Sequence, residues 1–203
     1  RRRYLRKRIN LLKKQINDLS QRRMQNRSKR EKNELFSATL IGYTCAGKST
    51  LFNKLTKSNV VESTKPFSTL NPTTRRTYIS NETEILLSDT VGFITDLPED
   101  LISSFRATLE EINQSDLLIH IVDCSEDNFE EKIMSVEDTL IRTKLINHKR
   151  IIIFNKIDLI NSETLNYIES KYHQPCVSST KNLGINDARL EIEKIIQSTF
   201  KKP

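Results

Sequence analysis

One run of the sequence has the residue types and spacing of a phosphate-binding loop. It matches the pattern G-x-x-x-x-G-K-[ST] and consists of Gly42, Tyr43, Thr44, Cys45, Ala46, Gly47, Lys48, Ser49 and Thr50. Glycine lets the backbone approach an anion closely, and successive N–H groups at a helix N-terminus bind phosphate. Lys48 would neutralise the outer phosphate charge, and the Ser49 hydroxyl would ligate Mg²⁺. The run therefore predicts a nucleotide site, with Lys48 as a catalytic residue.

A second group of residues is suited to the metal and the terminal phosphate. The sequence Asp89, Thr90, Val91, Gly92 follows a short apolar run. A carboxylate at Asp89 would reach Mg²⁺ through water, and the Gly92 N–H would bond the γ-phosphate. All four glycines of the chain lie in loops expected at the nucleotide, since Gly42, Gly47 and Gly92 are joined by Gly184.

Two later groups are suited to a purine base. Asn155, Lys156, Ile157 and Asp158 follow the apolar run at residues 151–154. The Asp158 carboxylate would accept from guanine N1–H and the 2-amino group, which adenine lacks, and ATP would be rejected because a buried unpaired carboxylate is costly. Asn155 would tether the loops and face the base edge, and the Lys156 stem would lie across the ring. Ser178, Ser179 and Thr180 would offer a backbone N–H to guanine O6.

Strands and helices alternate through the part of the chain that carries these groups. Short apolar runs predict strands at residues 36–41, 84–87, 117–122, 151–154 and 176–177. Helical periodicity predicts helices at residues 49–55, 98–112, 129–145, 162–172 and 186–200. Residues 77–80 would pair antiparallel with 84–87 through a turn at Asn81. This order predicts an α/β fold with a mostly parallel six-stranded sheet covered by helices on both faces.

The net charge of +7 is divided unevenly along the 203 residues. Residues 1–32 hold 14 Lys and Arg against 2 Asp and Glu, whereas the remainder carries a net charge of −5. Leu5, Ile9, Leu12, Ile16 and Leu19 form a narrow apolar seam at helical spacing, which predicts a basic amphipathic helix. We therefore expect a basic helical linker or coiled-coil segment at residues 1–33 and one globular domain at residues 34–203. The basic segment is suited to a polyanion or to a solvated helix face.

Composition narrows the class of protein further. The mean hydropathy is −0.52 and no apolar run approaches the roughly 20 residues that span a bilayer. We expect no transmembrane segment, which leaves peripheral membrane association open. The three cysteines have no Cys-x-x-Cys spacing and the three histidines are scattered, so we expect neither a disulfide framework nor a zinc site. A reducing cytoplasm and a monomer are the expected setting.

Several longer strings resemble the HflX family of ribosome-associated GTPases. They lie at residues 42–53, 67–75, 89–94, 97–98 and 104–111, and a basic helix ahead of the domain is similar to that family as well. The resemblance implies a Ras-like fold, GTP and GDP as ligands with Mg²⁺, GTP hydrolysis, and the large ribosomal subunit (rRNA and protein), with no DNA, as partner. It further implies splitting of stalled ribosomes and a family N-terminal domain upstream of this chain.

The resemblance also implies the first switch. Its residues would be Phe67, Ser68, Thr69, Leu70 and Asn71, with Thr69 as Mg²⁺ ligand and γ-phosphate sensor, while Thr73 and Thr74 compete for that role. The catalytic residues are then Lys48, Thr69 and Gly92, and the metal ligands are Ser49, Thr69 and Asp89.

The chain departs from the family pattern in two loops. Cys45 stands where the family usually has Asn, which a backbone-mediated cradle tolerates, although a Cys beside phosphates is open to oxidation. Ser178, Ser179 and Thr180 stand where the family usually has Ser-Ala-Lys, so the backbone contact remains, the Lys stem is lost, and guanine affinity would weaken.

Phe93 follows Gly92, where Ras-like enzymes carry the glutamine that orients the attacking water. We therefore expect slow basal hydrolysis that a partner completes. Two alternatives remain. One is an RNA- or ribosome-binding module whose GTP site acts as a sensor with little turnover, and the other is a P-loop ATPase, against which the residues 155–158 argue.

Overall fold

The computed structural model describes residues 35–57, 73–92, 109 and 111–200. The chain divides into a unit of residues 1–35 and a unit of residues 36–203, and only the second is described below. The predicted basic helix at residues 1–33 and the first switch at residues 67–71 lie outside the described residues.

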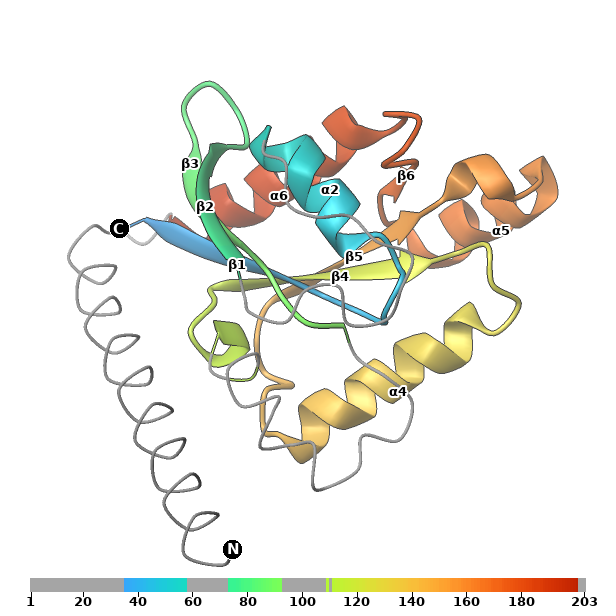
Figure 1. Ribbon diagram of the computed structural model, residues 1–203, viewed down its shortest axis with the longest axis horizontal. Coiled ribbons are helices and arrows are strands. Elements are labelled where there is room, and N and C mark those ends of the chain that lie inside the picture. The colour runs from blue at the N-terminus through green and yellow to red at the C-terminus, as the bar shows by residue number, and fades with distance from the viewer. Residues whose placement is uncertain (1–34, 58–72, 93–108, 110, 201–203) are drawn as a thin grey trace, which may run out of the picture. The chain divides into compact units, whose positions relative to one another are not determined.

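Six strands form one sheet in the order β2-β3-β1-β4-β5-β6 (Figure 1). The strands are β1 (Phe36–Ile41), β2 (Thr73–Tyr78), β3 (Glu84–Asp89), β4 (Leu117–Asp123), β5 (Arg150–Asn155) and β6 (Cys176–Val177). All neighbouring pairs are parallel except β2 with β3. The predicted mostly parallel six-stranded sheet is confirmed. Three central strands run one or two residues longer than their apolar runs, because polar residues continue the ladder.

The edge strand β2 begins and ends earlier than the sequence analysis expects. It covers Thr73–Tyr78, with Thr73 opposite Asp89 and Tyr78 opposite Glu84. Residue Ile79 instead closes the turn, since its N–H donates to Thr83 O at 2.9 Å. The predicted antiparallel pairing with β3 is confirmed for Thr77 and Tyr78. The predicted bounds 77–80 were wrong because an edge strand needs few apolar residues: in β2 only Thr77 is buried, and its hydroxyl donates to Leu55 O at 2.6 Å.

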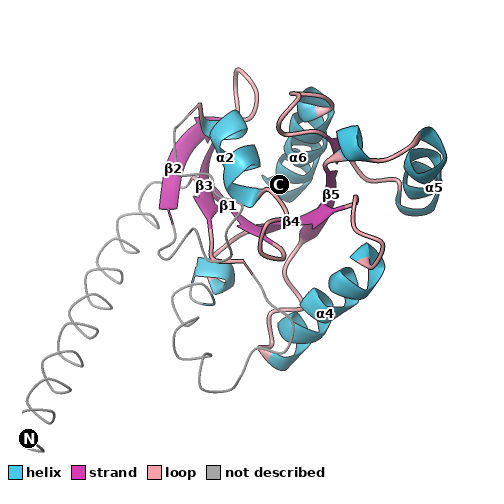
Figure 2. Cartoon of the chain, turned by 45° about the vertical axis from the view of Figure 1, so that its right-hand side comes forward, coloured by secondary structure: helices cyan, strands magenta, loops and turns pink. Residues whose placement is uncertain are grey.

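Helices cover both faces of the sheet (Figure 2). They are α2 (Lys48–Thr56), α4 (Phe129–Arg142), α5 (Ser162–Tyr172) and α6 (Ile185–Phe200), with a 3₁₀ turn η1 (Ile157–Leu159). Helices α2 and α6 share one apolar core with strands β1 and β3 to β6. On the opposite face α4 and α5 pack in two further clusters, centred on Leu140 and on Phe154. The expected helix at residues 98–112 lies largely outside the described residues, although 111–113 are helical and Ile112 is buried.

Helix α4 ends at Arg142, three residues before the end that its periodicity predicts. Lys144 adopts the left-handed conformation with φ 61°. Its N–H donates to Ile141 O at 3.0 Å, and the Leu145 N–H donates to Leu140 O at 2.7 Å. This is the Schellman pattern, in which a buried apolar residue beyond the helix end packs on its last turn. Leu145 continues the apolar period without continuing the helix.

Parallel strands bring their carboxyl ends to one edge of the sheet, which is where open α/β sheets bind ligands. The loops after β1, β3, β4, β5 and β6 all leave from this edge. Among the described residues, no helix combines the length and apolar character needed to cross a membrane.

Candidate functional site

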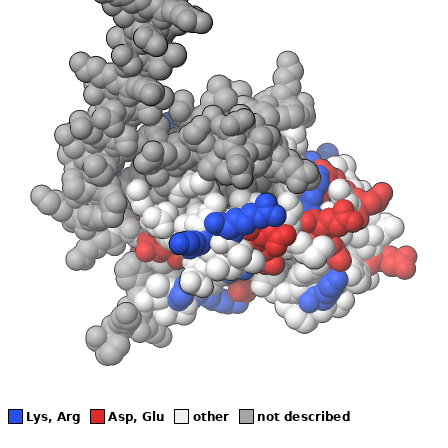
Figure 3. All heavy atoms as spheres, turned by 90° about the horizontal axis from the view of Figure 1, so that it is seen from below, with Lys and Arg blue, Asp and Glu red and all other residues white. Residues whose placement is uncertain are grey.

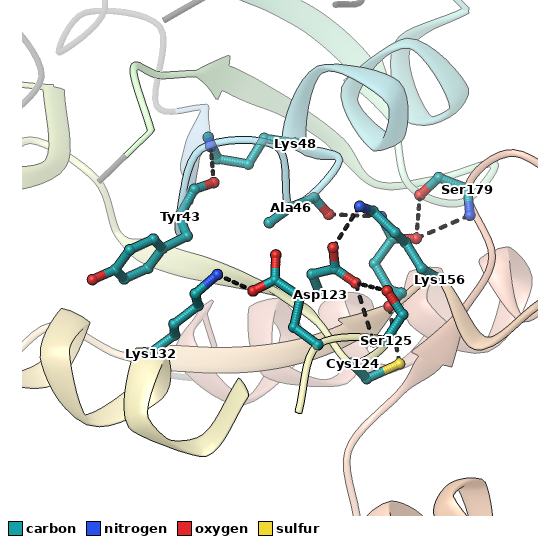
Figure 4. A network of polar contacts seen from close by, with 11 residues as sticks. Tyr43, Ala46, Lys48, Asp123, Cys124, Ser125, Lys132, Lys156 and Ser179 are labelled. Carbon is teal, nitrogen blue, oxygen red and sulfur yellow. Dashed lines mark hydrogen bonds and ion pairs between the residues drawn. The ribbon is translucent and has the colours of Figure 1, made fainter. Parts of the chain in front are cut away.

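The loop between β1 and α2 is closed by its own lysine. The Lys48 ammonium donates to Tyr43 O at 2.7 Å and to Gly42 O at 3.2 Å (Figure 4). Burial lowers the pKa of Lys48 to about 8, although the charge of Asp89 acts in the opposite direction. Since an ammonium has three N–H donors, one remains for an anion in the loop.

Ser49 and Asp89 meet beside this lysine. The Ser49 hydroxyl donates to Asp89 Oδ2 at 2.7 Å. Asp89 is the last residue of β3 and its side chain is fully buried. A hydroxyl and a carboxylate in contact are the hard oxygen donors that Mg²⁺ prefers, so the chemistry of these two residues fits the metal that the sequence predicts.

The segment after β3 lies close against the phosphate loop. The Thr90 hydroxyl donates to Leu40 O at 2.7 Å, which fixes this segment to β1. A Cβ atom added to Gly92 would lie 2.7 Å from Lys48 Nζ and 2.8 Å from Thr44 Cα. Only glycine therefore permits this approach, and it brings Gly92 to the lysine that serves the phosphate loop.

Asn155 joins three loops. Its amide nitrogen donates to Ala46 O at 2.8 Å. Its amide oxygen accepts from the Ser179 N–H at 3.0 Å and from the Ser179 hydroxyl at 2.9 Å (Figure 4). The side chain is 2% exposed, so these bonds lie in a dry environment where they are strong. These hydrogen bonds of Asn155 hold the phosphate loop and the two predicted base loops together.

The predicted base-binding carboxylate is exposed. Asp158 lies in η1, at the surface. The sequence argument against ATP therefore depends on burial of this carboxylate by the bound base. Desolvation of Asp158 would arise only when a base covers it, so discrimination against adenine would come with binding.

The loop after β6 has already used two of its three backbone N–H groups. Ser178 donates to Leu183 O at 3.0 Å, and Ser179 donates to Asn155. Within the described part of the chain, the exposed Thr180 is left as the donor of this tripeptide for a base oxygen. Of the three backbone N–H groups expected to donate to guanine O6, the N–H of Thr180 is therefore the candidate.

The sequence profile of the 50S ribosome-binding GTPase family matches residues 37–156. The chain belongs to this family. Curated relatives include the GTPase HflX of Alkalihalophilus pseudofirmus, 43% identical over 77% of this chain and 37% of the relative. The GTPase HflX of Lacrimispora saccharolytica is 38% identical over 97% of this chain and 47% of the relative. The resemblance to HflX is thus confirmed. The chain spans less than half the length of these two relatives.

A solved structure supports the Ras-like fold of this family member. The complex of SsGBP with GDP superposes with a TM-score of 0.63 at 26% identity, covering 92% of this chain and 60% of SsGBP. The fold predicted from the sequence, a P-loop GTPase domain, is therefore confirmed.

Three residues of the predicted GTPase site face away from it or lie beside it. The Tyr43 hydroxyl lies 3.1 Å from Ser135 Oγ on α4, so only the backbone of Tyr43 can serve the phosphate loop. Cys45 is exposed with φ 64°. Thr74, one of the three candidates for the switch ligand, lies in β2, where its hydroxyl contacts Ser88 Oγ at 2.9 Å and Glu111 Oε1 at 3.2 Å. The Thr74 hydroxyl is therefore engaged beside β3, and Thr69 lies outside the described residues.

Sequence reasoning missed Asp123. It ends β4 directly beside Asn155 in the ladder, and its Oδ2 accepts from the Lys156 ammonium at 2.5 Å. The signal that could have found it is an acidic residue directly after the apolar run 117–122, at the same sheet edge as Asp89 and Asn155.

Proposed function

We propose that this chain binds GTP with Mg²⁺ and hydrolyses it to GDP and phosphate. The observation that carries the proposal is the Asn155 side chain, which bonds Ala46 in the phosphate loop and Ser179 in the last base loop. Such a tether sets the distance between the phosphate contacts and the base contacts, which is a distance that a nucleotide must match.

The residues of the phosphate loop supply positive potential without reorganisation. Lys48 is already oriented by two carbonyl groups, so its third donor needs no further ordering to meet a phosphate oxygen. The N-terminus of α2 begins at this lysine and adds its own dipole. Together they favour the charge that accumulates on the phosphates during transfer.

Ser49 and Asp89 are the residues that would hold Mg²⁺, with Thr69 as the third ligand by resemblance to the family. Bound there, the metal would neutralise phosphate charge. Asp89 has no freedom to turn to solvent, since it is fully buried.

Guanine would be recognised by two edges of the site. Asp158 accepts from the N1–H and 2-amino groups, and the Thr180 N–H donates to O6. Asn155 holds both loops in place while its own hydrogen bonds stay within the protein. Adenine would leave Asp158 covered and without donors, which costs affinity.

Hydrolysis by the chain alone would be slow, because Phe93 follows Gly92 and a phenyl ring cannot orient water. A partner that orders the switch segments would complete the site. The large ribosomal subunit in the cytoplasm is the partner we propose, supported by the family description and by the +12 net charge of residues 1–32. On the face of the domain in Figure 3, acidic and basic side chains are interspersed. By sequence, the densest basic segment of the chain is residues 1–32. Splitting of stalled ribosomes is the role we propose for this contact.

The test is GTP turnover by the full chain, alone and with purified large ribosomal subunits. We expect stimulation by large subunits, loss of it on raising the salt concentration as phosphate contacts weaken, and no comparable effect of small subunits. The Ser49→Ala variant should bind the subunit and fail to be stimulated.

One alternative function is a ribosome-binding sensor with little turnover, which the phenylalanine at position 93 favours. It predicts that large subunits change GTP affinity and leave the hydrolysis rate at background. Tight GTP binding without stimulated turnover would favour this alternative over the proposed enzyme.

A further inference from the structure

The lysine of the base loop is held at its tip. Lys156 adopts the left-handed conformation with φ 71° and ψ 33°, directly after the end of β5. Its ammonium lies 2.5 Å from Asp123 Oδ2, and its side chain is 31% exposed while that of Asp123 is 6% exposed (Figure 4). The four-carbon stem is therefore fixed at both ends, at the backbone by β5 and at the ammonium by a carboxylate on β4.

The carboxylate that holds the lysine is itself fixed. Asp123 Oδ1 accepts from the Ser125 hydroxyl at 2.6 Å and from the Ser125 N–H at 3.1 Å. The next residue, Cys124, donates its N–H to Asn155 O at 3.1 Å and its thiol to the same oxygen at 3.0 Å. The turn after β4 is thus hydrogen-bonded to Asn155, the residue that begins the base loop, and the orientation of the Asp123 carboxylate is fixed.

We propose that Asp123 is a positioning residue of the guanine site, acting through Lys156. This inference rests on the proposed function. The carboxylate holds the lysine stem where it covers the base, so the stem does not have to be ordered when the nucleotide binds. A free lysine side chain loses rotamer entropy when it is ordered, and ordering it beforehand improves affinity through preorganisation.

The position of Asp123 predicts which kinetic quantity it controls. Asp123 contacts the base loop, and its hydrogen bonds reach neither Lys48, Ser49 nor Asp89. Removal of the Asp123 carboxylate should therefore weaken binding of the substrate and of the transition state equally, which raises KM and leaves kcat unchanged.

The test is a double-mutant cycle on the full chain with Asp123→Asn and Lys156→Met, read by GDP titration and by GTP kinetics. Loss of a charge-assisted hydrogen bond should raise the Kd for GDP and the KM for GTP roughly 10- to 100-fold in Asp123→Asn, with kcat within about twofold of wild type. Because Asp123 acts through Lys156, the double variant should bind GDP no more weakly than Lys156→Met alone.

The matched control is Ser125→Ala, which removes the hydroxyl bond to Asp123 Oδ1 but keeps the backbone N–H bond that orients the same carboxylate, and does not touch Lys156. It should leave the Kd for GDP within about threefold of wild type, and thermal unfolding of the nucleotide-free variants shows whether either loses stability. Three results would overturn the inference: additive effects of the two substitutions on the Kd for GDP, an unchanged Kd in Asp123→Asn, or a loss of GDP affinity in Ser125→Ala equal to that in Asp123→Asn. Tight binding of GDP by the wild type would still uphold the guanine site of the proposed function. Failure of the wild type to bind guanine nucleotides would overturn both.

Discussion

The ammonium of Lys48 is buried under the phosphate loop with two carbonyl acceptors and a carboxylate nearby. Burial of a charge costs free energy unless a counter-charge compensates for it, and here burial outweighs Asp89, so that the pKa of Lys48 falls from 10.5 to about 8. At neutral pH the chain retains this charge at a cost in stability. The phosphates of a nucleotide would provide the missing compensation.

This cost predicts how stability depends on pH. The folded-state pKa of Lys48 lies below its unfolded value, so between pH 8 and 10.5 the unfolded chain binds more protons and the free energy of unfolding rises with pH. Relative to Lys48→Met, the wild type should gain up to about 3 kcal/mol across this window. Urea unfolding of nucleotide-free protein at several pH values measures the difference.

Lys54→Met, at an exposed position of the same helix, is the control for removal of one positive charge at the surface. Lys48→Met should in addition weaken GTP binding about 100-fold, as a charge-assisted bond is lost. Parallel pH profiles of wild type and Lys48→Met would contradict the burial of the charge.

At the residue scale, sequence motifs identify side chains whose residue type is required by the ligand that they bind. Lys48, Ser49, Asp89 and Asn155 were all named from the sequence, and the structure brings them to one edge of the sheet. Asp123 was missed because its partner Lys156 lies 33 positions away, and no local pattern encodes their contact. The exposure of Asp158 is likewise not encoded in its motif, because burial depends on the whole fold.

The elements position the site through close backbone contacts between loops. Gly47 precedes α2 with φ 93°, and a Cβ atom there would lie 2.2 Å from the Asn155 amide nitrogen. Gly47→Ala should therefore push the phosphate loop away from Asn155 and break the bond to Ala46. We expect GTP affinity to fall about 100-fold or more through loss of a buried hydrogen bond and backbone strain, measured by nucleotide titration.

A double variant separates the collision from the strain. Asn155→Ala removes the amide with which a Cβ atom at position 47 would clash. Gly47→Ala should therefore reduce GTP affinity less in the Asn155→Ala background than in the wild type. Equal costs in the two backgrounds would mean that the tether does not depend on this contact.

At the element scale, prediction succeeded where burial and local pattern agree. The apolar runs of β1, β4 and β5 and the capped helix α5, whose Asn161 side chain accepts from the Thr164 N–H, were placed closely. It failed for the bounds of β2, where an edge position removes the apolar signal. It also failed for the end of α4, because Lys144 takes a left-handed conformation that usually marks glycine.

Across the whole molecule, glycines and basic residues are concentrated in different parts of the chain. Helix ends at Lys57, Lys144 and His173 adopt positive φ without glycine, while Gly42, Gly47 and Gly92 lie at close approaches around the phosphate loop. The basic charge is concentrated in residues 1–32 and the rest of the chain is mildly acidic. On our account the second part binds and hydrolyses the nucleotide, and the first contributes to the ribosomal contact.

The most direct test of the account is the nucleotide preference of the wild type and of Asp158→Asn, measured by titration with GDP, XDP and ATP. We predict that the wild type prefers GDP, and that Asp158→Asn loses about 100-fold in GDP affinity and prefers XDP, whose 2-oxo group accepts from an amide. Equal binding of ATP and GDP by the wild type, or an unchanged preference for GDP in Asp158→Asn, would contradict the guanine site at this edge of the sheet.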